Sequence, residues 1–373
     1  MEKDALEILN TLHKRGFSGF IVGGYVRDKL LGINTKDIDL CSNATPKDIA
    51  KFFTIAKATY GERYGTTFIK YRNHKYEITT FRKELNYLKH RSPETVTYID
   101  KIDDDLIRRD FTINAICIDR SGKIYDPLKG RSDLKKRLIR CIGDTDKKIE
   151  NDCLRILRAI RLAAILDFKL DDELEQAIYK YKGNLINISF DTKKRELDKI
   201  LCSKHINKGL ELISKFGLED YLHIKVPKNI INTDLLGLYY QLGLAESYPL
   251  TKVEKEGVKT IDYLVNKDDI TKMDLILCGL YNVKIAAVIK GLNVNLINQM
   301  YNELPLKSIN DVNVVGEDIC EILNVPPSPV IRRIKDDIVN EIVYRDLANH
   351  KNAIRSYLLK NKNKWYNELG EEA

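Results

Sequence analysis

Two glycines and two aspartates near the N-terminus are the residues of this chain best suited to chemistry. Gly23 and Gly24 follow an apolar run, Arg27 comes next, and Asp37 and Asp39 follow on alternate positions. Without β-carbons, the glycine turn lets backbone amides and a helix N-terminus approach phosphates closely. Asp37 and Asp39 would share one face of a strand, because side chains alternate along it. The pattern therefore predicts a site for a nucleoside triphosphate with Mg²⁺ as the cofactor.

Each of these patterns by itself more often marks a turn or a helix cap than a functional site. Glu77 could add a third acid, because it interrupts an apolar, β-branched stretch where an unpaired buried carboxylate would be costly. It could then orient an attacking hydroxyl or help to deprotonate it. A solvent-facing position on the strand explains Glu77 equally well.

Two adjacent arginines, Arg108 and Arg109, precede an apolar segment that the sequence predicts as a strand. Arginines entering such a segment need anions, and arginine binds phosphate with two parallel hydrogen bonds. Asp110 could hold one guanidinium in place, and Asn114 could contact a ribose. A surface salt bridge at the start of the strand is the alternative.

Asp152 and Arg155 are three residues apart on a predicted helix. Cytosine and adenine each present an amine donor beside a ring-nitrogen acceptor, whereas guanine and uracil present the opposite order. One carboxylate plus one guanidinium would therefore accept C and A and reject G and U. Arg158 and Arg161 continue at three-residue steps, each of which drifts about 60° around the helix. An ordinary helical ion pair is the alternative for Asp152 and Arg155.

The elements that must position these residues differ between the two parts of the chain. Up to about residue 140, strand and helix signals mix, with strands expected at 17–24 and 37–41 and a hairpin from 66–71 and 76–81. After about residue 142 the apolar period changes to 3.6, and no segment reads convincingly as a strand. The sequence thus predicts an α/β domain, with a mixed sheet and helices, followed by an all-α part.

Size and composition limit the kind of protein. The 373 residues suffice for two or three domains, and the net charge of +8 allows nucleic acid as a partner without proving it. The seven cysteines are scattered without a C-x-x-C pair, which favours reduced thiols in a cytoplasmic protein. No apolar run approaches the roughly 20 residues of a membrane span, and the N-terminus lacks the features of a signal peptide. We therefore expect no membrane partner.

Taken together, the motifs resemble those of the class II CCA-adding enzymes. These are bacterial-type tRNA nucleotidyltransferases that share a family with bacterial poly(A) polymerases. Residues 23–28 with 37–40 resemble the first motif of the family, 108–115 the second, and 152–161 the nucleotide-recognition motif. The match is close over about the first 165 residues and looser in the C-terminal part.

The resemblance implies template-independent addition of C, C and A to the 3′ end of tRNA from CTP and ATP. It also implies an elongated molecule with a nucleotidyltransferase head. The expected parts are a catalytic head at 1–140, a helical neck for nucleotide recognition at 141–203, a helical body at 204–303 and a tRNA-binding helical tail at 304–373.

The resemblance assigns roles to single residues. Asp37 and Asp39 would be catalytic and would bind the metal, and Glu77 would be the third catalytic acid. The expected nucleotide-binding residues are Gly23, Gly24, Arg27, Arg109, Asn114, Asp152, Arg155, Arg158 and Arg161. Of these, Gly23 and Asn114 are expected from the motifs alone and not from the resemblance. Among the nucleotide-binding residues, Asp152 and Arg155 would read the base, with Arg158 and Arg161 toward the phosphates.

Several positions depart from the family pattern. Asn151 stands where an acid usually precedes the base-reading aspartate. In the loop after residue 84, Leu85 stands where glycine is common and Lys89 where an acid is common, and Asp191 with Thr192 replaces a Glu-Arg pair. The departures leave the catalytic acids intact but weaken the assignment of the switch from C to A.

The expected partner is tRNA, held at its acceptor stem and elbow. Candidate contacts are Lys193, Lys194, Arg195, Lys204, Arg332, Arg333 and Lys335. The alternatives are a CC-adding or A-adding enzyme of a split pair, a poly(A) polymerase, and a non-catalytic RNA-binding protein. The full-length loop after residue 84 argues against the CC-adding enzyme, and the lack of a long basic extension argues against poly(A) polymerase. The intact acids argue against a non-catalytic protein.

Overall fold

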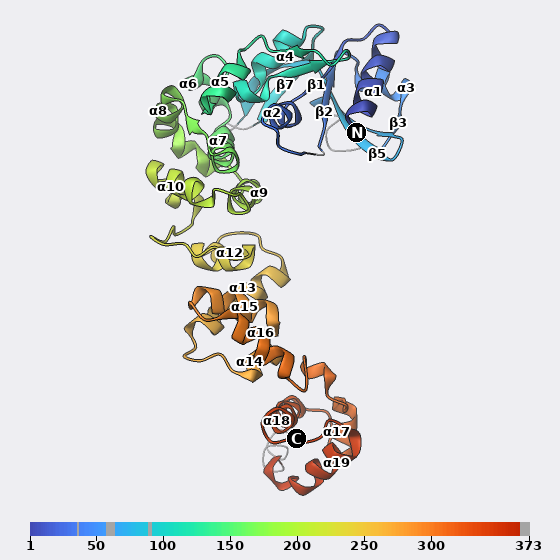
Figure 1. Cartoon of the computed structure of the whole chain (residues 1–373), viewed down its shortest axis with the longest axis vertical. Coiled ribbons are helices and arrows are strands. Elements are labelled where there is room, and N and C mark those ends of the chain that lie inside the picture. Colours follow the sequence, from blue (N-terminus) through green and yellow to red (C-terminus); the bar gives the residue numbers. More distant parts are fainter. Residues whose placement is uncertain (36, 57–63, 89–91, 366–373) are drawn as a thin grey trace. The chain divides into compact units, whose positions relative to one another are not determined.

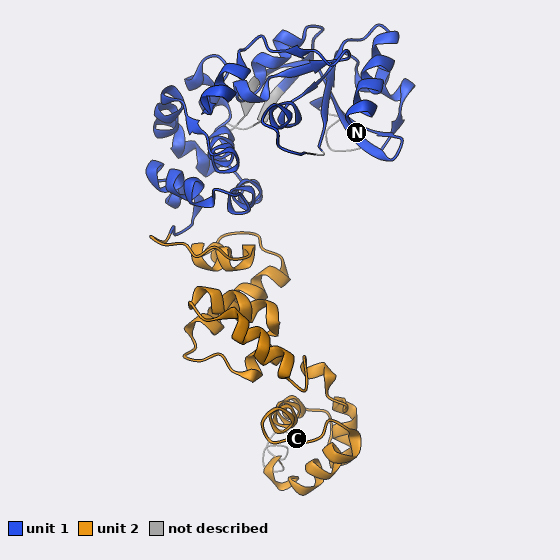
Figure 2. Cartoon of the chain, viewed as in Figure 1, with its two compact units in different colours: residues 1–226 blue, residues 227–373 orange. Residues whose placement is uncertain are grey.

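The computed structural model describes residues 1–35, 37–56, 64–88 and 92–365. The chain forms two compact units, residues 1–226 and residues 227–373 (Figure 2). Unit 1 combines a mixed sheet with helices, and the described part of unit 2 consists of helices joined by loops (Figure 1). This confirms the predicted fold class of a mixed-sheet head followed by a mostly helical remainder. Within the described ranges, no helix is long and apolar enough to cross a membrane.

The sheet of unit 1 has the strand order β3-β4-β5-β2-β1-β8-β9. The neighbours β2 and β5 are parallel, whereas the other neighbouring strands are antiparallel. Its strands are β1 Gly19–Val22, β2 Asp39–Ser42, β3 Thr54–Ile55, β4 Thr66–Tyr71, β5 His74–Thr80, β8 Cys117–Asp119 and β9 Ile124–Tyr125. A separate antiparallel pair consists of β6 Arg82–Leu88 and β7 Ser92–Tyr98.

Helices cover both faces of this sheet. Helix α1, Glu2–Lys14, packs on one face, because Leu9 and Leu12 lie against Gly19 of β1. Helix α4, Ile102–Arg108, packs on the other face in a buried cluster with Val22. The remaining helices of the sheet region are α2 Gly24–Leu30, α3 Pro46–Phe52, the 3₁₀ helix η2 Thr112–Asn114 and α5 Gly130–Lys136. This packing brings the ends of β1, α2 and α4 together.

Helices follow the sheet in the rest of unit 1. Helix α7 is central, since it packs against both α9 and α10 and buries Leu157, Ile160 and Ala164. The helices are α6 Thr145–Asn151, α7 Leu154–Leu166, α8 Asp172–Tyr181, η3 Lys182–Asn187, α9 Phe190–Leu201, α10 Ile206–Phe216 and α11 Glu219–Leu222. One prediction is wrong here: β11, Lys169–Leu170, pairs in parallel with β10, Leu138–Ile139. Two residues are too few for their periodicity to be visible in the sequence.

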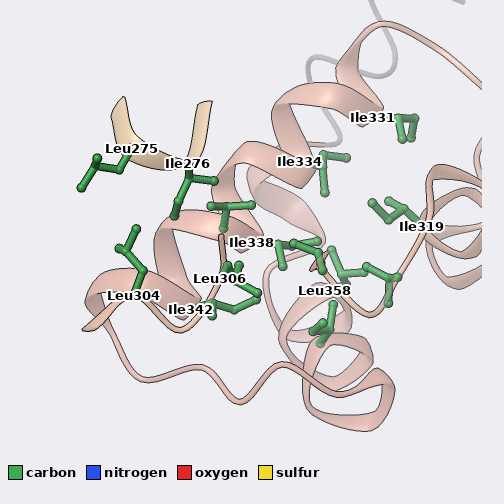
Figure 3. Close-up of a cluster of buried hydrophobic side chains, with 14 of the residues drawn as sticks. Leu275, Ile276, Leu304, Leu306, Ile319, Ile331, Ile334, Ile338, Ile342 and Leu358 are labelled. Carbon is green, nitrogen blue, oxygen red and sulfur yellow. The ribbon is translucent and has the colours of Figure 1, made fainter. Parts of the chain in front are cut away.

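Unit 2 contains a hydrophobic cluster whose buried residues range from Leu264 to Trp365 in sequence. Figure 3 shows part of this cluster. Leu304 and Leu306 lie within it, so a division of the chain near residue 305 would cut through one core. The helices of this unit are α12 Leu235–Leu242, η4 Leu244–Glu246, α13 Lys252–Asn266, α14 Lys272–Leu277, α15 Gly279–Ile289, α16 Val294–Glu303, η5 Ile309–Asp311, α17 Gly316–Leu323, α18 Val330–Tyr344 and α19 Lys351–Lys360.

The strand around the two aspartates is shorter than the sequence predicts. Strand β2 begins at Asp39, so Asp37 lies just ahead of it rather than on it. The last pair of the antiparallel ladder is Val22 with Asp39. The residue that would pair with Asp37 is Gly24, which already belongs to α2. The turn at Gly23, with φ of 83°, therefore ends both strands.

The hairpin is confirmed, but its turn is tighter than predicted. Strand β5 begins at His74, which pairs with Tyr71, so only Arg72 and Asn73 form the turn. Arg72 accordingly adopts the left-handed conformation, with φ of 51°, that a two-residue hairpin turn requires.

Arg108 and Arg109 do not begin a strand, contrary to the sequence prediction. They lie at the C-terminal end of α4, and η2 follows them. Asp105 forms ion pairs with both arginines at i,i+3 and i,i+4 spacing, which a helix brings together and a strand does not.

Asp152 and Arg155 do not share one helix as predicted. Asp152 directly follows α6, which ends at Asn151, and α7 begins at Leu154. The backbone of Asp152, with φ of −139° and ψ of 89°, is not helical and separates the two helices. Asp152 therefore stands at a helix junction, where its carboxylate faces the first turn of α7.

Gly130 allows α5 to approach η2 closely. A Cβ atom at this position would lie 2.3 Å from the carbonyl oxygen of Thr112 and 2.8 Å from Ile116. We expect Gly130→Ala to lower the free energy of unfolding by about 1–3 kcal/mol, the usual range for overpacking, as measured by urea titration. Gly183→Ala is the matched control, because no atom lies within 4 Å of its added Cβ. Equal stability of the two variants would contradict a tight contact between α5 and η2.

Candidate active site

A cavity of about 850 Å³ in unit 1 brings the predicted residues together. It lies where the end of β1, α2, α4 and α7 meet. The predicted residues that line it are Gly23, Gly24, Arg27, Asp37, Asp39, Arg109, Asn114, Asp152, Arg155, Arg158 and Arg161. Glu77 does not line the cavity but lies directly beside Asp39, its partner across β2 and β5.

The acids at one end of the cavity repel one another. Burial raises the pKa of Asp39, and the charge of Asp37 raises it further, against the opposing charge of Arg109. Burial and the charges of Asp39 and Asp37 likewise raise the pKa of Glu77. A bound divalent cation would relieve this repulsion, and hard carboxylate oxygens are the ligands that Mg²⁺ prefers. The donor set of Asp37 and Asp39 therefore fits such an ion.

Few protein ligands are available for that ion. In the described part of the chain, no cluster of three or more His, Cys, Asp or Glu residues could enclose a metal. Two carboxylates leave the remaining positions to phosphate oxygens and water, which is the usual arrangement for Mg²⁺ with a nucleotide. Gly23 keeps this end open, since a Cβ there would lie 3.4 Å from Asp39 Oδ2.

A chain of hydrogen bonds crosses the cavity wall from α2 to α7. Arg27 Nη1 donates to Asn114 Oδ1 at 2.7 Å, and Asn114 Nδ2 donates to Asp110 Oδ1 at 3.2 Å. Arg158 Nε donates to Asp110 Oδ2 at 2.9 Å. Burial would raise the pKa of Asp110, but the charges of Arg158 and Arg155 outweigh it and hold that pKa well below its usual range. The chain fixes Arg27, Asn114 and Arg158 in place.

Asp105 organises the arginine pair, and the sequence analysis did not single it out. Its side chain is fully buried and accepts from Arg108 Nε at 2.8 Å and from Arg109 Nη2 at 3.1 Å. Burial would raise the pKa of Asp105, but the charges of Arg109 and Arg108 outweigh it and lower the pKa. The signal was present in the sequence as an acid three and four residues before two arginines.

Asp152 and Arg155 face the cavity as a loose ion pair. Arg155 Nε lies 4.0 Å from Asp152 Oδ2, which is too long for a hydrogen bond. Among the described residues this buried Nε has no hydrogen-bond partner, although Nη2 donates to the carbonyl of Arg108 at 3.4 Å. The two side chains thus present a carboxylate and a guanidinium next to each other, as reading of a base edge requires.

Arg161 reaches the cavity from α7 and is held by Glu196 of α9, with Nη1 to Oε2 at 2.7 Å. Arg108 and Asp110, which the sequence analysis placed in the arginine motif, also line the cavity. The lining residues that the sequence analysis missed are Tyr25, Asp28, Thr35, Tyr64, Arg82, Glu84, Leu162, Ile165 and Lys199. Among these, Lys199 has no pattern that distinguishes it from a solvated lysine.

The departures at Asn151, Lys89 and Thr192 lie in different places. Asn151 is the last residue of α6, next to Asp152, and Thr192 lies in the first turn of α9. Lys89 lies outside the described residues. Of the candidate tRNA contacts, Lys193 is wrong: its side chain is buried and donates to the carbonyl of Tyr221.

Comparison with known proteins agrees with this geometry. Family models match three parts of the chain: the poly A polymerase head domain at 19–140, the RNA- and SrmB-binding site of polymerase A at 167–226, and tRNA nucleotidyltransferase domain 2 at 253–358. The fold and the match to the head domain identify the chain as a nucleotidyltransferase.

Similarity over the full length narrows the class. The chain is 31% identical over 382 residues to the CCA-adding enzyme of Ligilactobacillus salivarius, covering 94% of each chain. It is 29% identical over 391 residues to that of Geobacillus stearothermophilus, covering 96% of each. The crystal structure of the Bacillus stearothermophilus CCA-adding enzyme in complex with CTP is similar with a TM-score of 0.84 at 27% identity, covering 98% of both chains. The chain belongs to the family of CCA-adding enzymes.

Proposed function

We propose that this enzyme adds C, C and A to the 3′ end of tRNA from CTP and ATP without a template. One observation carries the proposal: a single cavity joins the acids Asp37 and Asp39 to the pair Asp152 and Arg155. The first pair suits phosphate chemistry, and the second suits recognition of C and A. Membership in the family of CCA-adding enzymes supports the same conclusion.

We propose Mg²⁺ as the metal, with Asp37 and Asp39 as its protein ligands. When bound there, it would supply neutralisation of the phosphate charge that develops during nucleotidyl transfer. Glu77, next to Asp39, would orient the attacking 3′-hydroxyl or accept its proton. Burial and its acidic neighbours raise the pKa of Glu77, which makes its carboxylate a stronger base for accepting that proton.

Arginines would bind the nucleotide. Arg27, Arg109, Arg158 and Arg161 line the cavity and offer cationic donors to phosphate oxygens. Asn114, fixed between Arg27 and Asp110, is placed for a ribose contact. Gly24 starts α2, where the backbone can approach a phosphate without a side chain intervening.

The experiment that tests the function is a product-length assay. A tRNA ending at its discriminator base is incubated with the whole chain, Mg²⁺, CTP and ATP, and the products are separated at single-nucleotide resolution. The proposal predicts that extension stops after three nucleotides. Extension by one or two nucleotides would favour an enzyme of a split pair, and a long ladder would favour a poly(A) polymerase.

Base choice is expected to depend on Arg155. Arg155→Ala should weaken discrimination against UTP and GTP by about 1–3 kcal/mol, the range for a good bidentate base contact. The measurement is kcat/KM for each of the four triphosphates on the same tRNA. Arg137→Ala is the control, because its side chain is 61% exposed and does not line the cavity. Wild-type selectivity in Arg155→Ala would mean that Asp152 and Arg155 have a structural role and do not read the base.

We propose that the helices after about residue 142 bind the acceptor stem and elbow of tRNA. Duplex RNA offers phosphates and 2′-hydroxyls rather than base edges, so basic side chains are the expected contacts. Exposed candidates are Arg195, Lys204, Arg332 and Arg333. The division into head, neck, body and tail remains part of this proposal, and the free thiols of all seven cysteines favour the cytoplasm as the place of action.

A further inference from the structure

The end of α4 is held by cations from two other helices. Lys148 of α6 donates to the carbonyl oxygens of Ile107, at 2.5 Å, and Arg109, at 3.0 Å. Arg155 of α7 donates to the carbonyl oxygen of Arg108, between them in the chain, at 3.4 Å. Three consecutive carbonyl groups therefore receive hydrogen bonds from the segment that carries the base-reading pair.

This contact satisfies a general need of helix ends. The last carbonyl groups of a helix have no partner within the helix and form the negative end of its dipole. A cation at this end is favourable, and a lysine that contacts two of the carbonyls fixes their direction. Lys148 thus holds the last turn of α4 in the orientation that Arg155 contacts.

We propose that Lys148 is a positioning residue for base selection, which aims Arg155 by fixing the carbonyl group on which Arg155 rests. The inference rests on the proposed function, because it assumes that Asp152 and Arg155 read the base. Within the described residues, few other contacts hold the guanidinium: its buried Nε has no hydrogen-bond partner and lies 4.0 Å from Asp152 Oδ2. A shift of the Arg108 carbonyl would therefore move Arg155.

The contact between Lys148 and α4 should also depend on pH, because it depends on the charge of Lys148. Burial and the charge of Arg155 lower the pKa of Lys148 to about 8, against the opposing influence of Cys141, Asp110 and Glu84. The protonated form, which donates three hydrogen bonds and carries the charge, prevails below this pKa and is lost as the pH rises through it. The hold on α4 should weaken in the same range.

The arginines of α4 cannot replace that charge. Arg108 and Arg109 are both paired with Asp105. An arginine at position 148 would keep its proton throughout the range in which lysine loses it. The substitution Lys148→Arg thus separates the effect of the charge from other pH effects on the reaction.

The test compares the wild type with Lys148→Met, Lys148→Arg and the control Lys147→Met, whose side chain is 77% exposed on the same helix. It measures kcat/KM for CTP and for UTP on a tRNA ending at the discriminator base, from pH 7 to pH 9.5. At pH 7, Lys148→Met should lower the CTP-over-UTP ratio roughly tenfold, within the range for loss of a base contact. The wild-type ratio should fall above about pH 8, and the ratio of Lys148→Arg should not.

The outcomes distinguish a failure of the positioning role of Lys148 from a failure of the proposed function. An unchanged ratio in Lys148→Met, or identical pH profiles for the wild type and Lys148→Arg, would overturn the positioning role. If Lys148→Met does not fold, the two pH profiles still give the answer. A wild type that adds no C at all would instead refute the proposed function, and this result is recognisable without any variant.

Discussion

Replacing Asp39 with asparagine is expected to lower the rate of nucleotide addition by about 10³-fold or more, and Asp37→Asn should do the same. Both carboxylates lie at the same end of the cavity, and burial together with their mutual repulsion raises the pKa of Asp39. Stabilisation by a metal held there is worth several kcal/mol in the transition state, and each 1.4 kcal/mol is a factor of ten.

The stability of these variants should not fall, because each substitution removes one member of a repelling pair. Steady-state addition of C to tRNA measures the activity, and urea unfolding measures the stability. Asp104→Asn is the matched control in the same unit, since Asp104 lies outside the cavity and is paired only loosely, at 3.6 Å, with Lys83. Near wild-type rates in both active-site variants would show that these acids do not hold the catalytic metal.

The largest expected effect on stability is that of Asp105→Ala. The substitution leaves the guanidinium groups of Arg108 and Arg109 buried without their common anion, and it also removes the acceptor for the backbone amide of Arg82. Breaking a buried ion pair by removing one partner typically costs about 3–5 kcal/mol. Urea unfolding of unit 1 should show a loss in this range, whereas Asp104→Ala should stay within about 0.5 kcal/mol of the wild type.

The same residue gives a pH dependence with a definite sign. The pKa of Asp105 is lowered in the folded protein, so its contribution to stability is fully present above the unfolded value of about 3.9. That contribution is lost as the pH falls through the folded pKa. The difference in stability between wild type and Asp105→Ala should therefore shrink below about pH 4. A constant difference down to pH 2 would mean that Asp105 acts through packing rather than charge.

Much of the site could be predicted because the motif residues carry their function in their types and spacing. Asp37 and Asp39, the glycine turn, and the pair Asp152 and Arg155 lie in one cavity although far apart in the sequence. This inference was possible because charged side chains inside apolar segments, and a glycine pair next to acids, are unusual unless they bind an ion or a phosphate. The resemblance to a known family then supplied their common purpose.

The local structure around them was harder to predict, for identifiable reasons. Asp37 lies ahead of β2 because the turn at Gly23 removes the strand partner it would need. Arg108 and Arg109 belong to a helix because Asp105 binds both, and a short apolar stretch does not distinguish a helix from a strand. Lys148 gave no signal at all, since a lysine on a short helix is ordinarily solvated.

The burial of Lys193 illustrates the same limit. Its neighbours in sequence, Thr192, Lys194 and Arg195, are polar or positively charged. Its side chain is nevertheless buried on α9, and its ammonium group donates to the carbonyl of Tyr221. Basic residues that contact RNA can be distinguished from basic residues with a structural role only when the burial of their side chains is known. The chain gives no periodic pattern that separates them.

The most direct test of the central account is nucleotide choice on a tRNA that already ends in CC. Each of the four triphosphates is supplied alone with Mg²⁺, and the added nucleotide is identified by mass under single-turnover conditions. If one protein site reads C and A through Asp152 and Arg155, ATP should be incorporated once and GTP and UTP should be rejected. Comparable incorporation of GTP or UTP, or no incorporation of ATP by an enzyme that adds both C residues, would contradict the account.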